Sequence, residues 1–423
     1  MSTTSTQKPV LISGAGLASL LLAQSLLRAR IPFEIFERDS SFSFRAQGYR
    51  LRLSSEGLDA IESVLGPEKF QRFWDLCGKT GGGGFAAIDA KTGASTNLSS
   101  TESQFIQKLK DEKEKAAADE AEKAQSSRPP TESLASRGGK IVGISRGDMR
   151  KFFMEGCEEF IHWSHRVASY ELTPSGVFAI FSDGTKSTEG QILVAGDGVY
   201  SKVAKQLSEG KLKVYDTGAR GIHGQAPTTA FKALGEGVWR MTDDSNPKGR
   251  VFAITNVRPG DMDDPTVQFG WTMAAQPGVI RAPNDDYTLI GAPAAAIAKD
   301  LTTDWHPKVK SLFQEMAESE AAFWKISCST PSGVPQWQNQ PRVTVIGDAV
   351  HSMTPAGGIG ANTAVRDSAL LGRLLSEAGG LVNGITDAYE REMRLYASEA
   401  VASSYGMATT QFGVIIDENS DTI

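Results

Sequence analysis

The chain has 423 residues, of which 40% are hydrophobic and 22% are charged, as in ordinary globular proteins. This length predicts two or three domains, each able to bury a core. The formal net charge of −6 argues against nucleic acid or an anionic membrane as a partner. The sequence has no Cys-x-x-Cys pair, so we expect neither a disulfide framework nor a structural zinc site, and we place the protein in the reducing cytoplasm. The cysteines are Cys77, Cys157 and Cys328.

The ends and apolar runs of the sequence predict a soluble protein. Met1–Lys8 is polar and lacks the basic start and apolar stretch of a signal peptide. Apolar runs fall short of the roughly 20 residues that span a bilayer. We therefore expect no integral membrane segment, and a monomer or homodimer.

The first elements in chain order form a βαβ unit. Val10–Ser13 reads as a buried strand, and an apolar helix follows from Leu17 to about Arg30. Pro32 stops the helix, and Phe33–Phe36 gives a second strand.

Further along, α/β segments alternate with α+β segments, which predicts domains that are not contiguous in sequence. A Gly run at 81–84 marks a turn into a hairpin-like stretch. The periodicity predicts helices over 56–77, 148–160 and 308–318 and two long helices ending near 405, with strands over 162–172, 177–181, 192–195 and 343–346 and a strand-rich region over 213–273.

The composition changes sharply between about 99 and 139. Lys108–Lys115 and the Ala/Glu-rich segment after it have almost no apolar face. We expect a solvated, frayed helix or a disordered loop here.

The first glycine motif is Gly14-x-Gly16-x-x-Ser19, between the first strand and the first helix. Glycines let the backbone approach a pyrophosphate, the helix N-terminus stabilises its charge, and Glu37 after the next strand can accept hydrogen bonds from ribose hydroxyls. The motif predicts an adenine dinucleotide without choosing between NAD and FAD. The alternative is an ordinary Gly-rich turn.

Two later motifs follow buried strands. Ile192–Ala195 leads into Asp197-Gly198, which alone is a common left-handed turn. Val343–Ile346 delivers Asp348, whose carboxylate can hold sugar or ribityl hydroxyls. The Gly-rich segment 355–362 then opens a long helix, whose N-terminus offers bare N–H groups to an electron-rich ligand.

Taken in order, these motifs resemble the para-hydroxybenzoate hydroxylase-like FAD-dependent aromatic hydroxylases. Gly14–Ser19, Asp197-Gly198 and Gly347-Asp348 match the family's three glycine-centred segments. Arg146–Arg150 is similar to its Arg-x-x-Leu-Arg stretch, and Gly48–Arg52 also resembles a segment of family members.

The resemblance implies an α/β fold, α+β overall: a Rossmann-like FAD-binding domain interleaved with a mostly antiparallel substrate domain and C-terminal helices. The expected FAD-binding parts are 1–80, 140–212 and 336–423. The charged insert and a substrate-domain segment occupy 81–139, and the substrate-binding β-sheet domain occupies 213–335.

Position by position, the resemblance also implies the site. Pro355 would lie where oxygen adds, beside Gly357 and Gly358. Apart from the resemblance, His223 lies on a predicted strand and is a candidate catalytic residue in the substrate pocket. The implied FAD-binding residues are Gly14, Gly16, Leu17, Ala18, Ser19, Glu37, Arg38, Arg146, Asp197, Asp348, Gly358, Gly360, Ala361 and Asn362.

The implied reaction uses NADPH or NADH to reduce tightly bound, non-covalent FAD, and O₂ to form a flavin C4a-hydroperoxide that oxidises an aromatic or polyketide-like substrate. Hydroxylation is the favoured reaction, and secondary metabolism is the expected setting. Epoxidation, Baeyer–Villiger oxidation and oxidative rearrangement stay open, as does flavin binding without turnover. That last alternative rests on Ala204-Lys205, where family members usually have Arg.

The histidines and aromatic residues leave alternatives open. His162 and His165 lie in a strand-like pattern that would point them opposite ways, so we expect no metal site. His351 is expected to support its turn, and a structural role for His223 is the alternative to a pocket role. Large residues on the strands can line a pocket or simply form core, namely Trp239, Phe269 and Trp271.

Overall fold

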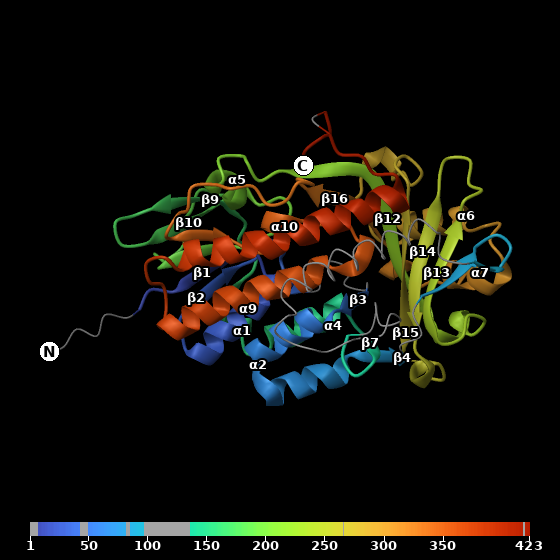
Figure 1. The fold of residues 1–423 in the computed structure, drawn as a ribbon, viewed down its shortest axis with the longest axis horizontal. Coiled ribbons are helices and arrows are strands. Elements are labelled where there is room, and N and C mark those ends of the chain that lie inside the picture. Colours follow the sequence, from blue (N-terminus) through green and yellow to red (C-terminus); the bar gives the residue numbers. More distant parts are fainter. Residues whose placement is uncertain (1–6, 43–49, 82–84, 97–135, 265, 418) are drawn as a thin grey trace, which may run out of the picture.

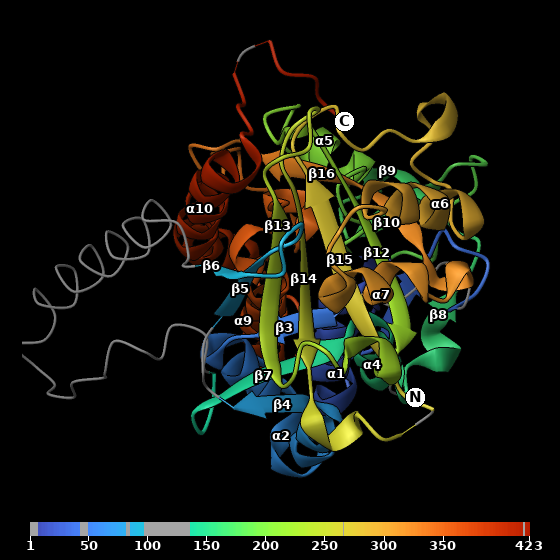
Figure 2. The ribbon, with the colours of Figure 1, turned by 90° about the vertical axis from the view of Figure 1, so that its right-hand side faces the viewer.

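The computed structural model describes residues 7–42, 50–81, 85–96, 136–264, 266–417 and 419–423. Its elements form two main sheets with helices packed against each (Figures 1 and 2). The predicted charged insert falls almost wholly within 97–135, outside the described residues, and its character stays a prediction. In the described part of the chain, no helix is long and apolar enough to cross a membrane.

The first sheet is parallel and has five strands, in the order β17-β11-β1-β2-β8. Three of its strands are buried along their whole length, as expected for a parallel sheet covered on both faces. Its strands come from distant parts of the sequence: β1 (Val10–Ser13), β2 (Phe33–Phe36), β8 (Ile161–His162), β11 (Ile192–Ala195) and β17 (Val343–Val345).

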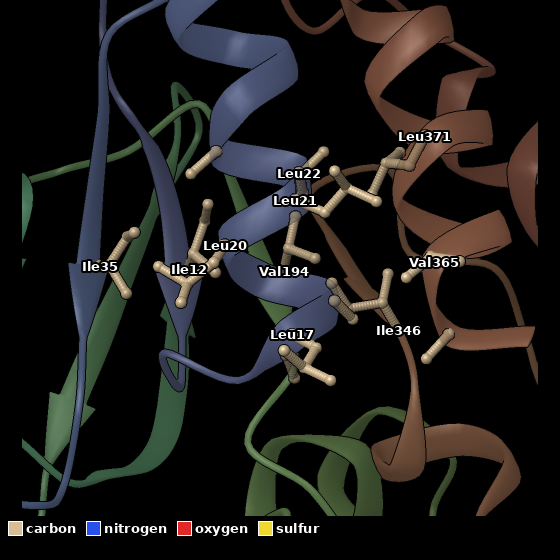
Figure 3. Close-up of a cluster of buried hydrophobic side chains, with 14 of the residues drawn as sticks. Ile12, Leu17, Leu20, Leu21, Leu22, Ile35, Val194, Ile346, Val365 and Leu371 are labelled. Carbon is tan, nitrogen blue, oxygen red and sulfur yellow. The ribbon is translucent and has the colours of Figure 1, made fainter. Parts of the chain in front are cut away.

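Helix α1 (Leu17–Ala29) lies between this sheet and helix α9 (Gly360–Ala378). Figure 3 shows Leu20 of α1 beside Ile12 of β1, while Leu22 lies on the side of Leu371 of α9. Helix α10 (Ile385–Phe412) packs beside α9 (Figure 1). The predicted βαβ unit and long C-terminal helices are therefore confirmed.

Two predicted helices end or bend differently from the prediction. Helix α2 (Ser55–Leu76) is kinked at Gly66, which has a φ of 74° and precedes Pro67. Helix α4 (Arg146–Met154) stops short of the predicted end at 160, because the chain turns at Gly156, whose φ is 83°. A single 3₁₀ turn covers Glu158–Phe160 instead.

The predicted strand over 162–172 is also interrupted. The chain turns at Ser164, whose φ is 60°, so β8 ends at His162 and β9 (Val167–Leu172) begins after the turn. The rings of His162 and His165 lie 5.9 Å apart and both contact Phe36, so the expectation that they point opposite ways is wrong. Within the described ranges, no group of three or more His, Cys, Asp or Glu residues is placed to hold a metal.

The second sheet has seven strands, in the order β16-β12-β15-β14-β13-β5-β6. Neighbours are antiparallel except β5 and β13, so the predicted mostly antiparallel sheet is confirmed. Its strands are β5 (Phe85–Asp89), β6 (Ser95–Thr96), β12 (Val214–Pro227), β13 (Gly237–Asp243), β14 (Val251–Val257), β15 (Gln268–Ala275) and β16 (Ala322–Ser329).

One face of this sheet packs on helices α6 (Ala292–Leu301) and α7 (Pro307–Gln314), seen beside it in Figure 2. Trp271 is 1% exposed, and its ring centroid lies 4.8 Å from that of Phe313 of α7, with the rings tilted by 59°. Phe269 is buried in the same cluster. These two aromatic residues are therefore core, as the alternative interpretation held.

Smaller elements complete the fold. Strands β3 (Arg50–Leu53), β7 (Lys140–Ser145) and β4 (Gly78–Gly81) form a three-stranded antiparallel sheet. Strand β9 pairs with β10 (Val177–Phe181), and the short helices α5 (Lys202–Leu207) and α8 (Asp348–His351) follow β11 and β17.

Candidate functional site

The three glycine motifs meet at the carboxyl edge of the parallel sheet. Gly14 has a φ of 88°, and a Cβ atom there would lie 2.7 Å from the Cα of Asp197 in the loop after β11. A Cβ on Gly347, after β17, would lie 3.3 Å from the Cβ of Ala18. Adjacent parallel strands end at the same edge, and the glycines let their loops touch.

Glu37 and Arg150 hold the first glycine loop from two sides. The Glu37 carboxylate accepts hydrogen bonds from the N–H of Ala15 at 2.7 Å and from the N–H of Asp39 at 2.9 Å. Arg150 Nε donates to the carbonyl of Ala15 at 2.8 Å, and its Nη2 lies 3.8 Å from Glu37. Sequence reasoning gave Arg150 no role, although it ends the Arg-x-x-Leu-Arg-like stretch.

The first turn of α1 offers backbone to a ligand, because its side chains face the protein interior. Leu17, Ala18 and Ser19 are buried. A Cβ on Gly196 would lie 2.2 Å from Ser19 Oγ, so the glycine at 196 permits close packing of this helix and the loop after β11. Gly16 precedes the helix without a side-chain cap, which leaves N–H groups of the first turn available.

Asp197 has an unsatisfied group at this edge. Its Oδ1 is buried and has no hydrogen-bond partner among the described residues. Burial raises the pKa of this carboxyl, while hydrogen bonding to Ser201 and Ser13 and, last, the charge of Arg38 oppose the rise. A buried carboxylate oxygen without a partner fits a ligand or water that donates a hydrogen bond.

Asp367 fastens the turn that presents Asp348. Its carboxylate accepts hydrogen bonds from the N–H of Gly347 at 2.7 Å and from the hydroxyl of Tyr396 at 2.7 Å. His351 Nε2 lies 2.6 Å from the same carboxylate, and both side chains are fully buried. His351 therefore supports its turn. This network links β17, α9 and α10, which are far apart in sequence.

Asp348 itself faces solvent at the end of β17. Desolvation by the surrounding protein nevertheless raises the pKa of its carboxyl, against the opposing charges of His351 and Arg146. This geometry suits the binding of sugar or ribityl hydroxyls.

The Gly-rich turn lies between α8 and α9. Gly357 and Gly358 have φ values of 80° and 62°, and both are exposed, as is Pro355. Helix α9 begins at Gly360 without a side-chain cap, and Ala361 next to it is half-buried. The turn therefore exposes backbone N–H groups and the positive end of a long helix.

Asn362 uses its side chain to tie this turn to strand β3. Its Nδ2 donates to the carbonyls of Gly358 and Arg52, each at 3.0 Å, and its Oδ1 accepts from the N–H of Ser54 at 2.8 Å. Only its backbone is left to border a ligand.

His223 and Arg146 extend the site to the second sheet. His223 is 7% exposed and lies opposite Thr272 of β15. Burial first, and then the charge of Arg146, lower the pKa of His223 to about 4. The same Arg146 charge acts on Asp348. Arg146 therefore lies close enough to influence both the sheet face and the strand edge.

Comparison with known proteins identifies the family. Residues 112–404 match the family described as FAD binding domain, and the chain belongs to that family. Its predicted place among the para-hydroxybenzoate hydroxylase-like FAD-dependent monooxygenases is confirmed.

Two curated relatives differ in how much of their own length this chain covers. The dual O-methyltransferase/FAD-dependent monooxygenase elcB of Phaeosphaeria nodorum is 30% identical over 411 residues, covering 87% of this chain and 40% of that protein. The FAD-dependent monooxygenase dbaB of Emericella nidulans is 26% identical, with 92% of each chain covered. The chain thus spans less than half the length of its dual-function relatives.

Two solved structures share the fold. HpxO of Klebsiella pneumoniae, complexed with FAD and uric acid, has a TM-score of 0.70 at 17% identity, covering 97% of this chain and 91% of that one. The 2,6-dihydroxypyridine-3-hydroxylase of Arthrobacter nicotinovorans has a TM-score of 0.68 at 16% identity, covering 98% and 95%.

The residues at the strand edge fit FAD. The orphaned Asp197 oxygen, the accessible Asp348 carboxylate and the exposed turn at Gly357 are suited to hydroxyl groups, a pyrophosphate-bearing chain and a flat ring. Their donors and acceptors come from three neighbouring strand ends, as an extended dinucleotide requires.

Proposed function

We propose that this chain is an FAD-dependent monooxygenase that uses NADPH or NADH and O₂ to insert one oxygen atom into a small aromatic or polyketide-like substrate. The observation that carries the proposal is that the loops of Gly14 and Asp197 touch at one edge of the sheet, where β17 also ends and leads to Asp348 and the exposed Gly357–Gly358 turn. Such an edge matches a dinucleotide at one end and a reactive ring at the other.

The binding roles follow from positions along the edge. The N–H groups of the first turn of α1, after Gly16, would face the pyrophosphate, and Glu37, beside Arg38, would accept hydrogen bonds from the adenosine ribose. Asp348 would bind ribityl or pyrophosphate oxygens, with Arg146 along the ribityl chain. Asp197 would accept a hydrogen bond from a cofactor hydroxyl or a bound water.

The ring end of the site would use backbone more than side chains. Backbone from Gly357 to Asn362 would border the ring, because the turn is exposed and α9 starts uncapped. Pro355 and Gly358 would leave room for O₂ beside it. Bound FAD supplies the electron transfer and oxygen activation that the side chains cannot supply.

His223 would act on the substrate side as a neutral imidazole. Its lowered pKa of about 4 keeps the imidazole uncharged at neutral pH. The ring can then accept a hydrogen bond from a substrate hydroxyl or donate one to it. Hydroxylation is our preferred reaction, since the relatives include a protein named a hydroxylase. Epoxidation, Baeyer–Villiger oxidation and rearrangement would use the same site.

Turnover under isotopically labelled O₂ tests the proposal. FAD-loaded protein is supplied with NADPH or NADH and a panel of phenolic and polyketide-like aromatics, and product mass is measured with cofactor consumption. We expect one labelled oxygen atom per NAD(P)H consumed with at least one compound. Product structure then separates hydroxylation from epoxidation and Baeyer–Villiger oxidation. Bound FAD without substrate-dependent consumption across the panel would favour a flavin-holding protein instead.

A further inference from the structure

We propose that Arg52 tunes the redox chemistry of the site by holding a positive charge beside the flavin ring, where it stabilises the reduced, anionic ring. The proposal rests on the proposed function, since it requires FAD in the Gly357–Gly358 turn. It concerns a side chain of strand β3, outside the three glycine motifs.

The guanidinium of Arg52 lies along that turn. Its Nη2 donates a hydrogen bond to the carbonyl of Gly357 at 3.3 Å. Its Nε lies 3.9 Å from the position that a Cβ on Gly358 would occupy. The positive charge therefore lies next to both Gly357 and Gly358, whose exposed backbone would border the ring.

The backbone of β3 fixes Arg52 relative to α9. The carbonyl of Arg52 accepts a hydrogen bond from Asn362 Nδ2 at 3.0 Å, and the N–H of Ser54 donates to Asn362 Oδ1 at 2.8 Å. The Ser54 hydroxyl also caps α2, accepting from the N–H of Gly57 at 3.1 Å. With its backbone held by Asn362 and its guanidinium bonded to Gly357, this cation needs little reorganisation when the charge on the ring changes.

The surroundings strengthen the effect of this charge. Arg52 is half-buried, and burial lowers the pKa of its guanidinium while the neighbouring carboxylate of Glu56 opposes the change. An arginine nevertheless stays protonated in proteins. A charge partly removed from water acts over a lower effective dielectric, so it attracts a nearby negative charge more strongly.

The helix N-terminus and Arg52 would act on the ring from the same turn. Helix α9 contributes a partial positive charge at Gly360, whereas Arg52 contributes a full one. Glu56, exposed in the first turn of α2, partly offsets Arg52. Removing Arg52 and removing Glu56 should therefore shift the midpoint potential in opposite directions.

The test is the two-electron midpoint potential of bound FAD, measured against reference dyes in the holoprotein, with FAD stoichiometry determined separately. Arg52→Gln should lower the preference for reduced over oxidised FAD by about tenfold or more, which is about 30 mV for a two-electron couple. Arg52→Lys keeps the charge and should remain close to wild type. Glu56→Gln should raise the potential.

Arg373→Gln is the matched control. Arg373 is an exposed arginine on α9 itself, paired with Glu377, and about 20 Å along the helix from its start. Its loss removes the same charge far from the turn, so the potential should stay at the wild-type value.

The outcomes separate this inference from the proposed function. An Arg52→Gln protein with bound FAD and a wild-type potential overturns the inference, including the case where only substrate binding weakens and Arg52 serves the substrate instead. If Arg52→Gln fails to fold, an unchanged potential in Glu56→Gln overturns it equally. Failure of the wild-type protein to bind FAD would overturn the proposed function itself.

Discussion

The two main sheets position their functional groups in different ways. In the parallel sheet, the ends of β1, β11 and β17 lie at one edge, so topology alone brings their loops together. In the seven-stranded sheet, His223 lies within β12 and its neighbours depend on strand register, such as its pairing with Thr272. The edge therefore suits cofactor binding, whereas the sheet face suits adjustment of the chemistry. Substitutions in the two regions should have separable effects.

The largest expected effect is at the edge, in Gly14→Ala. A Cβ there would lie 2.7 Å from the Cα of Asp197, and the backbone at Gly14 is left-handed. We therefore expect the free energy of unfolding to fall by about 2–5 kcal/mol and FAD binding to be lost. Gly210→Ala is the control, because Gly210 has a φ of 78° and no neighbouring atom within 4 Å. It should cost only about 1–2 kcal/mol. Equal losses in urea denaturation would mean that the contact between the loops is unimportant.

The next effect lies on the sheet face and depends on pH. The pKa of His223 falls from its ordinary 6.5 to about 4 in the folded protein, so the folded state binds this proton less readily than the unfolded state. Stability that is present above pH 6.5 is therefore lost as the pH falls toward 4, by up to about 3 kcal/mol.

His223→Gln should remove this part of the acid sensitivity while FAD stays bound. The exposed His165 provides the control, and His165→Gln should keep the wild-type dependence. Free energies of unfolding at several pH values would measure the difference. Identical slopes for wild type and His223→Gln would contradict the buried, neutral assignment.

A smaller loss is expected for Asp348→Ala. Losing a carboxylate that accepts hydroxyl hydrogen bonds should weaken FAD binding by about 1–3 kcal/mol with little change in fold, since the side chain is exposed. Asp75→Ala removes an exposed carboxylate from α2 and should leave FAD affinity unchanged. Equal affinity for wild type and Asp348→Ala in a fluorescence titration would show that the strand end has been misassigned.

The smallest expected effect on FAD binding is at the Gly-rich turn, where loss of function can be separated from strain. Gly358→Val and Gly379→Val both place a side chain at positive φ, 62° and 69°, at opposite ends of α9. Both should lose similar stability and retain FAD. Only Gly358→Val should oxidise NAD(P)H largely to hydrogen peroxide without product. Stopped-flow reoxidation with peroxide and product measured together would reveal this, and wild-type coupling in Gly358→Val would place the oxygen site elsewhere.

Features that depend on neighbouring residues in the sequence were predictable, whereas features that depend on distant residues were not. Buried apolar strands and glycine turns are local patterns, so the βαβ unit and the strand end at Asp348 were predictable. Helix α6 was not predicted, and α4 ends earlier than expected because a glycine turn overrides its apolar spacing.

The contacts that complete the site are non-local. Tyr396 reaches Asp367 from another helix, Arg150 binds the carbonyl of Ala15, and Arg52 binds Gly357 across 305 positions of sequence. No spacing rule in a single sequence encodes such pairs. They follow only from the packing of elements already formed.

The most direct test of the account is a calorimetric comparison of FAD and FMN binding to the apoprotein. In the proposed site, loops after β1, β11 and β17 would bind one extended dinucleotide, with Glu37 at the adenosine end and Asp348 near the ribityl chain. This arrangement predicts one FAD per chain and much weaker binding of FMN, which lacks the adenosine half. Equal affinity for FMN, or no binding of FAD, would contradict it.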